Sequence, residues 1–164
     1  MDDINQISIT DQEYNNPWLV ESGVKLTLPD SELQKFAGFV YIIECLSPAA
    51  YGKKYIGQKG LWAIKKLPKN KSRKRTKRVR ISSDWKEYYG SSAELKNDIE
   101  KFGVECFSRK ILYLCSSKGD MNYLEMREQI VRDALIRDDF YNSFIGGKIH
   151  RKHITKSVHL LNRS

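Results

Sequence analysis

Two tyrosines lie in short apolar segments that are close together in the chain. Tyr41 stands within the apolar segment 38–43, and Tyr55 stands within 53–57, which ends in a glycine. A tyrosine ring is readily buried, but its hydroxyl then needs a hydrogen-bond partner or something to face. A dense cationic stretch, residues 65–80, follows the second segment. The pattern predicts a site at which two phenols and nearby cations bind an anion.

The basic charge of the chain is concentrated in this stretch. The 164 residues carry a formal net charge of +9, and ten lysines and arginines without any acid lie between residues 65 and 80. Without that stretch, 19 basic and 20 acidic residues remain. Such a run can be a solvated, disordered segment. Because it is internal and aromatic residues follow it, we favour binding to a polyanion, in which each neutralised phosphate releases counterions.

Composition excludes several classes of protein. No run of 18 apolar residues exists, which excludes a membrane span. The first residues have neither the basic nor the apolar region of a signal peptide, so none is expected. The odd number and wide spacing of Cys45, Cys106 and Cys115 are typical of buried thiols in a reducing compartment. No two of them have the spacing of zinc ligands.

The two tyrosine segments are predicted to be β-strands, at 38–45 and 53–58. The connection between them is too short for a crossover helix, so the strands should pair antiparallel. Residues 60–83 are expected to form a basic loop that holds a helical turn or a β-ribbon. Residues 1–36 are expected to be an N-terminal arm that packs in part through Trp18, Leu19 and Val20.

A helix and a third strand are predicted after the basic loop. Ser91 and Glu94 have the capping-box spacing, and Gly103 stands where a helix end favours glycine. Residues 106–114 alternate in character through Phe107, Arg109, Ile111 and Tyr113, which predicts a central strand. The apolar face of the helix is predicted to be Leu95, Ile99 and Phe102.

A second helix is predicted to be capped by Asp120 and to run to about Asp138. After a turn at residues 141–142, residues 148–164 form a basic tail. The order β-β-α-β-α predicts the α+β class, a small domain in which helices flank a three-stranded antiparallel sheet. The apolar stripe of the second helix is predicted to be Leu124, Ile130, Val131, Ala134 and Leu135.

Six short segments form a combined pattern along the chain: Phe39-Val40-Tyr41, Tyr55-Ile56-Gly57, 84–92, 101–103, Tyr123-Leu124-Glu125 and Tyr141-Asn142. Taken together, they make the chain similar to the GIY-YIG nuclease superfamily. The paired signature is altered in its first half, where Phe39 stands in place of the usual first glycine. The likeness covers about residues 37–147 and implies a nuclease domain there, with the basic insertion at 60–83. The chain resembles in particular the free-standing GIY-YIG homing endonucleases of tailed phages.

The resemblance implies that Glu125 binds one Mg²⁺ or Mn²⁺ ion. Mg²⁺ accepts one or two carboxylates and keeps several waters, so a single glutamate is sufficient. The ion polarises a phosphoryl oxygen as a Lewis acid. Glu125 follows the core-facing Leu124, so its side chain is expected at the edge of the apolar stripe and toward the sheet. The alternative is a solvated helix glutamate, as we expect for Glu128.

By the same resemblance, Tyr41 orients or deprotonates the attacking water, and Tyr55 hydrogen-bonds the water or the phosphate. A phenol with a pKa near ~10 is a poor base at neutral pH. Nearby cations, namely Lys54, Lys59 and the bound metal, can lower that barrier. The alternative is that both tyrosines are ordinary core residues.

The resemblance also assigns a glycine and an asparagine to the site. Gly57 is expected to let the backbone turn sharply at the strand end, where the substrate approaches. Asn142 is expected to hydrogen-bond a phosphate or a catalytic neighbour, or to form an Asx-type turn after the second helix.

The superfamily has a catalytic arginine soon after its second signature, but here residues 61–66 contain none. Lys65 could supply the charge, although not the bidentate contacts of a guanidinium. Alternatively, an arginine of the inserted loop takes that role. The predicted DNA contacts are Lys59, Lys66, Arg73, Arg75, Arg78 and Arg80. Trp85, Tyr88 and Tyr89 either pack in the core or stack against bases. Arg109 and Lys110 of the third strand are expected to lie on a solvated face or to contact phosphates.

The predicted function is a Mg²⁺-dependent endonuclease of the phage homing type. It would cleave double-stranded DNA in the cytoplasm of the host cell. We expect it to bind no membrane and no small-molecule cofactor, and the sequence predicts no particular oligomeric state. A restriction-like or degradative role is the alternative to homing. The missing arginine and the altered first motif leave a second interpretation open, a catalytically weak nucleic-acid-binding protein on a nuclease-derived scaffold. A third is an interaction module whose basic loop binds acidic protein surfaces.

Overall fold

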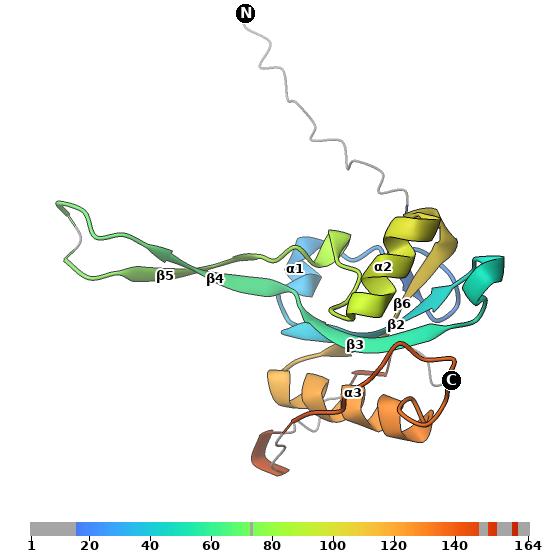
Figure 1. Cartoon of the computed structure of the whole chain (residues 1–164). Helices are drawn as coiled ribbons and strands as arrows, with labels where there is room; N and C mark the ends of the chain where they lie inside the picture. Colours follow the sequence, from blue (N-terminus) through green and yellow to red (C-terminus); the bar gives the residue numbers. More distant parts are fainter. Residues whose placement is uncertain (1–15, 73, 148–150, 154–158, 161–164) are drawn as a thin grey trace, which may run out of the picture.

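The computed structural model describes residues 16–72, 74–147, 151–153 and 159–160. They form a β-sheet with a helix against each face (Figure 1). Helix α2 (Ala93–Phe102) covers one face and α3 (Lys118–Val131) covers the other. The strand order is β1 (Leu19–Val20), β6 (Phe107–Cys115), β2 (Gly38–Cys45) and β3 (Lys54–Gly60).

The central strands confirm the α+β class and the order β-β-α-β-α. Strand β2 pairs antiparallel with β3, from Gly38 opposite Gly60 to Glu44 opposite Lys54. Strand β2 also pairs antiparallel with β6 on its other side, so β6 is central as predicted. The apolar residues of β2 are buried on both faces of the sheet, which explains why this segment is a continuous apolar run.

The sheet is wider than the predicted three antiparallel strands. Strand β1 pairs parallel with β6, with Leu19 opposite Lys110, and β7 (His159–Leu160) pairs antiparallel with the same strand, with Leu160 opposite Tyr113. The predicted packing of the N-terminal arm explains the extra strand. The indole of Trp18 is buried and donates to the Trp85 carbonyl at 2.7 Å, which fixes the following residues against β6.

The predicted alternation along β6 is interrupted by a bulge. Val40 lies opposite Tyr113, but the next residue, Tyr41, lies opposite Ile111, so Leu112 is the extra residue. Ile111 therefore packs on the α2 side of the sheet, whereas Tyr113 packs on the α3 side. The prediction that these two side chains share a face was wrong.

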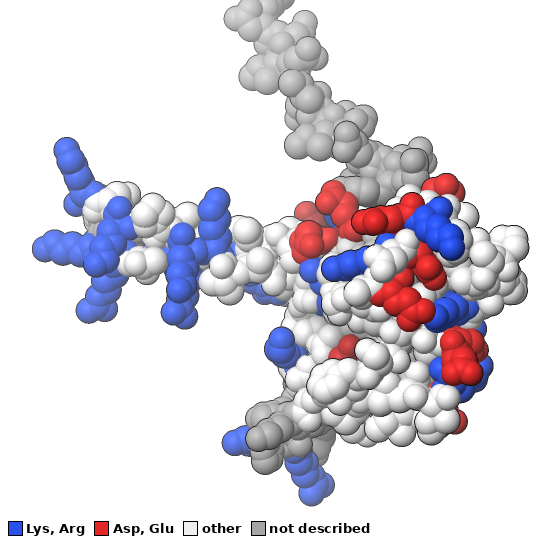
Figure 2. All heavy atoms as spheres, in the orientation of Figure 1, with Lys and Arg blue, Asp and Glu red and all other residues white. Residues whose placement is uncertain are grey.

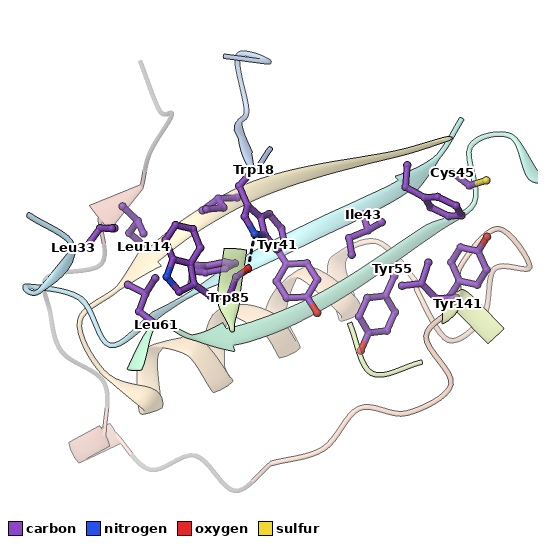
Figure 3. Packing of buried hydrophobic residues seen from close by; sticks show 14 residues of the cluster. Trp18, Leu33, Tyr41, Ile43, Cys45, Tyr55, Leu61, Trp85, Leu114 and Tyr141 are labelled. Carbon is purple, nitrogen blue, oxygen red and sulfur yellow. Dashed lines mark hydrogen bonds between the residues drawn. The ribbon is translucent and has the colours of Figure 1, made fainter. Parts of the chain in front are cut away.

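The core on the α2 side is rich in aromatic rings (Figure 3). Trp18 contacts Phe39 and Tyr41 edge-on, with ring centroids 5.0 and 5.1 Å apart, and Phe39 contacts Trp85 in the same way. Such pairs contribute about 0.5–1.5 kcal/mol each beyond the burial of their area. Its contacts with the Trp18 and Phe39 rings fix the position of the Tyr41 ring.

The basic insertion forms a β-hairpin, which confirms the β-ribbon alternative. Strand β4 (Trp62–Leu67) pairs antiparallel with β5 (Lys77–Ser82). The hairpin continues from β3 and projects away from the rest of the molecule (Figure 1). It forms a separate two-stranded sheet.

Helix α2 begins one residue later than predicted. The Ser92 side chain, and not that of Ser91, accepts from the Leu95 amide at 3.3 Å, and Ser91 instead contacts Tyr55. Gly103 ends the helix with a φ of 89°, a left-handed conformation that favours glycine. The predicted apolar face is confirmed, because Leu95 is fully buried while Ile99 and Phe102 pack against the same cluster.

Helix α3 differs from its prediction at both ends. Ser117 is the N-cap, and Asp120 lies buried in the first turn, where it accepts from the Ser117 hydroxyl at 2.8 Å. The helix ends at Val131 rather than near Asp138, because Asp133 adopts a left-handed φ of 55°. The predicted stripe was therefore wrong beyond Leu124: Ile130, Val131 and Leu135 are exposed, and Ala134 is buried outside the helix.

Glu128 is a second correction on α3, because it is not solvated. It is 8% exposed, accepts from the Tyr113 hydroxyl at 2.5 Å, and forms an ion pair with Arg132 at 2.9 Å. The bulge in β6 makes this contact possible, since it turns Tyr113 toward α3.

The remaining described elements are short. Helix α1 (Asp30–Leu33) buries Leu33, and single 3₁₀ turns lie at Pro48–Ala50, Trp85–Glu87, Val104–Cys106 and Arg151–His153. Cys45 and Cys115 are buried free thiols, as predicted, and Cys106 is half-buried. Within the described residues, no helix has the length and apolar character needed to cross a bilayer.

Candidate active site

A cleft of about 560 Å³ lies along β3, between the start of α2 and the side of α3. It brings together three predicted site residues that are far apart in the sequence: Tyr55 from β3, Glu125 from α3 and Asn142 from the following segment. The polar residues that line the cleft are Tyr55, Gln58, Tyr88, Ser91, Ser92, Glu94, Glu125, Gln129, Tyr141, Asn142 and Ser143.

Tyr41 lies beside Tyr55 but deeper in the protein. Tyr41 is 1% exposed, and the two ring centroids are 6.2 Å apart with a tilt of 42°. The two hydroxyl groups point to the same side of the molecule (Figure 3). The Tyr55 hydroxyl is hydrogen-bonded to the Ser91 hydroxyl at 3.0 Å, while the ring of Tyr88 meets Tyr41 edge-on at 6.2 Å.

Gly57 has a different role from the predicted turn. It lies inside β3, directly opposite Tyr41, with no left-handed backbone conformation. A methyl group at this position would lie 2.5 Å from the Tyr41 hydroxyl and 2.9 Å from the Tyr55 ring. Only glycine leaves room for both phenols at this point of the strand.

Glu125 is held at the cleft by an amide group. Gln58 donates to its Oε2 atom at 2.6 Å, and the same Gln58 nitrogen donates to Asn122 at 2.8 Å. Burial raises the pKa of the Glu125 carboxyl, an effect opposed by the Gln58 hydrogen bond and by the nearby Lys118 charge. Neither Gln58 nor Lys118 was found from the sequence, since each is an ordinary polar residue whose position depends on the fold.

The donor set at Glu125 fits a hard divalent cation. The side chain and the backbone amide of Gln58 both favour the ionised form of this carboxyl. Among the described residues, no group of three or more potential metal-ligating side chains occurs. A single partly desolvated carboxylate beside an open, polar cleft suits Mg²⁺, which retains most of its waters. It does not suit zinc, which needs three or four protein ligands.

Burial is the largest influence on the pKa of both phenols. Burial raises the pKa of Tyr41 well above its usual value, with further contributions from Tyr55, Tyr88 and Glu125. Burial likewise raises the pKa of Tyr55, against the opposing hydrogen bond from Ser91, and Glu125 contributes again. The expected influence of Lys54 is not found: its ammonium donates to the Gly52 carbonyl at 2.7 Å and pairs with Glu44 at 3.6 Å.

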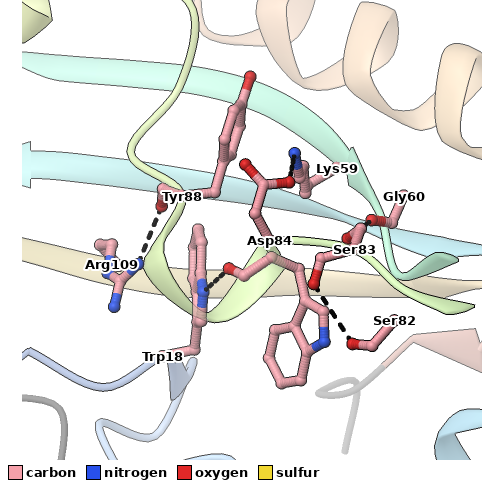
Figure 4. A network of polar contacts seen from close by, with 9 residues as sticks. Trp18, Lys59, Gly60, Ser82, Ser83, Asp84, Tyr88 and Arg109 are labelled. Carbon is pink, nitrogen blue, oxygen red and sulfur yellow. Dashed lines mark hydrogen bonds and ion pairs between the residues drawn. The ribbon is translucent and has the colours of Figure 1, made fainter. Parts of the chain in front are cut away.

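Lys59 belongs to a polar network beside the cleft (Figure 4). It pairs with Asp84 at 2.6 Å, and its ammonium lies 3.9 Å from the centre of the Tyr88 ring. The buried Arg109 donates to the Tyr88 carbonyl at 2.8 Å and lies between the Trp18 and Tyr89 rings. The network fixes the segment that carries Tyr88.

All three aromatic residues of this segment pack in the core on the α2 side, and their predicted stacking against bases stays a prediction. Trp85 is buried in the core, and Tyr89 packs on Arg109. Tyr88 lines the cleft and is the one of the three that lies beside the phenols. The prediction that Arg109 lies on a solvated face or contacts phosphate was wrong, because its side chain is buried in the core.

Asn142 binds the edge of β3. Its Oδ1 atom accepts from the Ile56 amide at 2.9 Å, and its Nδ2 atom donates to the Ile56 carbonyl at 2.7 Å. The side chain thus replaces a neighbouring strand at this residue. The Tyr141 amide donates to the Lys54 carbonyl two residues earlier, at 2.7 Å, so the segment is fixed at two points.

Most of the predicted cations lie outside the cleft. Lys65 and Lys66 are on β4, Arg78 and Arg80 are on β5, and Arg75 is in the loop between them, all exposed. Arg73 lies outside the described residues. Lysine and arginine are absent from the described residues that line the cleft, so the structure does not bring Lys65 or an arginine to the phenols.

A strand pair carries two adjacent phenols, and a glutamate from α3 and an asparagine from the segment after α3 line the cleft beside them, which is the arrangement expected of a GIY-YIG nuclease domain. Residues 18–145 match the family model described as "Putative endonuclease segE, GIY-YIG domain". The match covers most of the chain, so this chain belongs to the GIY-YIG endonuclease family. No solved structure matches it.

A curated relative agrees with the family match. Over 61 residues the chain is 36% identical to "Putative endonuclease segD" of Enterobacteria phage T4. The aligned part is 37% of this chain and 27% of the relative, so the chain matches about a quarter of that protein's length. The resemblance to phage GIY-YIG endonucleases is confirmed.

Proposed function

We propose that this protein is a DNA endonuclease that hydrolyses phosphodiester bonds of double-stranded DNA with Mg²⁺ or Mn²⁺. The observation that carries the proposal is the grouping of Tyr41, Tyr55 and Glu125. Tyr55 and Glu125 line one cleft, and the Glu125 carboxylate is close enough to both phenols to raise the pKa of each. Membership of the GIY-YIG family supports the same reaction.

Glu125 is the residue that would hold the metal ion. When bound, the ion polarises a phosphoryl oxygen and stabilises negative charge at the phosphate. Gln58 fixes the carboxylate through Oε2. This bond holds the carboxylate at the cleft, where it would bind the ion.

The two phenols would handle the attacking water and the phosphate. The raised pKa of Tyr41 keeps its hydroxyl protonated at neutral pH in the protein alone, so it would act first as a group that orients the water. Tyr55 and Ser91 share a hydrogen bond at the cleft, and together they offer two hydroxyls to a phosphate oxygen. Asn142 would act as a positioning residue, because both ends of its amide hold the backbone of Ile56, next to Tyr55.

The biological setting proposed is that of a phage homing endonuclease in the cytoplasm of an infected host. The similarity to a phage T4 protein named as an endonuclease supports it. The second candidate is a catalytically weak DNA-binding protein. The observation that favours it is the absence of lysine and arginine from the described residues of the cleft, where the superfamily would supply an arginine.

Supercoiled plasmid incubated with the purified protein separates these two functions. We expect nicked or linear products with Mg²⁺ or Mn²⁺. We expect none with EDTA, because EDTA removes the ion that would stabilise negative charge at the phosphate. If DNA is retarded on a gel but remains supercoiled with either ion, the DNA-binding alternative replaces the endonuclease proposal.

A further inference from the structure

The β4–β5 hairpin is attached firmly at its base. The Trp62 indole donates to the Phe36 carbonyl at 2.9 Å, and Arg80 stacks on Trp62 at 4.3 Å while donating to the same carbonyl at 3.2 Å. Directly after β5, the Ser83 hydroxyl donates to the Gly60 carbonyl, at the end of β3, at 2.6 Å. The orientation of the hairpin relative to the sheet is therefore fixed by the fold.

Beyond this base the hairpin has no core. Its strands are almost entirely exposed, including Ile64 at 63% and Ile81 at 42%. In Figure 2, lysine and arginine side chains extend above and below the hairpin and from its far end. An isolated two-stranded hairpin is only marginally stable in water, and like charges directly opposite each other destabilise it further. Lys66 lies directly opposite Arg78. A bound anion would relieve the repulsion between these two charges, so the charge pattern of the hairpin suits an anionic partner.

The register gives the ribbon two different faces. Residues directly opposite each other in an antiparallel pair point to the same side. One face therefore carries Ile64 with Arg80 and Lys66 with Arg78. The other face carries Ala63 with Ile81, Lys65 with Val79, and Leu67 with Lys77. Both guanidinium groups of the strands are on the first face, and the second face is mainly aliphatic.

We propose that this hairpin inserts into the major groove of double-stranded DNA, with the face of Lys66 and Arg78 toward the base edges. The proposal rests on the proposed function and names the element that engages its substrate. The major groove of B-DNA is about 12 Å wide and admits a two-stranded β-ribbon, whereas the minor groove is only about 6 Å wide and would have to be widened. Arginine binds the guanine edge in the major groove with two hydrogen bonds, and aliphatic groups contact the thymine methyl.

The hairpin and the cleft can reach one DNA molecule at the same time. Strands β3 and β4 follow one another with one residue between them, so Tyr55 and Lys66 are eleven residues apart along nearly continuous strand. Eleven extended residues span at most about 40 Å. One turn of B-DNA is about 34–36 Å long. The contact in the groove then lies within roughly one helical turn of the bond at the cleft.

Competition by groove-specific ligands tests the inference without any cleavage. Binding to a 24-base-pair duplex of mixed sequence is measured in EDTA, with methyl green as the major-groove competitor and distamycin as the minor-groove competitor. We expect methyl green to displace the protein and distamycin to leave it bound. An RNA duplex of equal length should bind more weakly, because its major groove is too deep and narrow for side chains to read.

Two double variants separate groove insertion from general charge attraction. One variant, Lys66→Ala/Arg78→Ala, removes two exposed cations from the first face of the hairpin. The other, Lys65→Ala/Lys77→Ala, removes two exposed cations from the second face. We expect the first to lose about ten-fold more affinity than the second, because a specific contact to a base edge is lost in addition to the charge. Equal losses would overturn the inference, as would displacement by distamycin.

The inference and the proposed function can fail separately. If plasmid is cut with Mg²⁺ but methyl green does not compete, the groove assignment is wrong and the endonuclease proposal stands. If methyl green competes and no plasmid is cut, the hairpin binds DNA as inferred and the catalytic proposal is wrong. Equal melting temperatures of the two double variants and the wild type show that the domain is folded in each.

Discussion

Glu125 is a carboxylate whose position favours function over stability. Its folded-state pKa is raised by burial, so the protonated form is favoured by folding. The protonated carboxyl therefore stabilises the folded state fully at pH values below its unfolded-state pKa. This stabilisation is lost as the pH rises through the higher folded-state pKa. At neutral pH the ionised side chain therefore opposes folding, unless a cation binds to it.

We predict that Glu125→Gln melts at or above the wild-type temperature at pH 7.5 without divalent ions. The amide oxygen keeps the hydrogen bond from Gln58, and the desolvated charge is removed. The difference should shrink toward pH 4, where the wild-type carboxyl takes up its proton. Thermal unfolding at both pH values measures this. A clear loss of stability in the variant at pH 7.5 would show that the carboxylate is held by compensating charges instead.

Tyr41 provides a prediction for activity alone. Tyr41→Phe keeps the ring that packs against Trp18 and Phe39 but removes the hydroxyl. We expect the cleavage rate to fall by about 10²-fold or more, the usual size of an acid–base or water-positioning contribution, with little change in melting temperature. Tyr51→Phe, at a 74% exposed tyrosine, is the control. An unchanged rate in Tyr41→Phe would remove this hydroxyl from the mechanism.

At the residue scale, the sequence predicted the side chains that resemble a known pattern and missed those defined by packing. Tyr55, Glu125 and Asn142 line one cleft beside Tyr41, as their combined pattern suggested. Glu128 was misjudged because its partner, Tyr113, faces α3 only as a result of the bulge. Arg109 gave no signal, since a buried guanidinium that donates to backbone carbonyls has no charged partner to look for.

Strand β3 depends on glycine at the point where the phenols cross it. We predict that Gly57→Ala destabilises the fold by about 1–3 kcal/mol, the usual effect of overpacking, because the new methyl group would lie 2.5 Å from the Tyr41 hydroxyl. Urea unfolding measures the change. Gly60→Ala, in the same strand with its nearest contact at 3.7 Å, is the matched control and should be much milder. Equal effects would mean that strand propensity, rather than room for Tyr41, decides the result.

The edge of β3 depends on Asn142. We predict that Asn142→Ala costs about 1–3 kcal/mol, because the Ile56 amide then lies at the strand edge without its acceptor. The activity should fall as well, since the cleft loses a side chain that positions its wall. Ser143→Ala, at the exposed neighbouring residue, should have little effect on unfolding. Wild-type stability of Asn142→Ala would show that the segment is fixed by the Tyr141 backbone alone.

At the element scale, periodic segments were predicted well and their ends were not. Strand β2 has the predicted bounds, because its short continuous apolar run is what a strand buried on both faces of a sheet requires. The cap of α2 was placed on Ser91 instead of Ser92, because adjacent serines offer the same hydroxyl and only the contact with Tyr55 distinguishes them. The end of α3 depends on the left-handed Asp133, a residue type that gives only a weak signal.

The whole molecule separates a neutral folded domain from a basic projection. The ten cations of residues 65–80 account for the excess charge, and the structure places most of them on a hairpin that leaves the domain (Figure 2). The superfamily resemblance implied a helix with an arginine after the second signature, and the hairpin occupies that position in the chain. The sequence could not decide between a helical turn and a ribbon, because a run of lysine and arginine has no apolar periodicity.

The cleavage rate of Glu125→Gln tests the central claim most directly. It is measured with Mg²⁺ on end-labelled DNA, at protein concentrations that saturate binding, beside wild type and the exposed control Glu100→Gln. The account predicts that Glu125→Gln binds DNA like the wild type but yields no detectable product, while the control cuts normally. Cleavage by Glu125→Gln at the wild-type rate would contradict the assignment of the cleft as a metal-dependent active site.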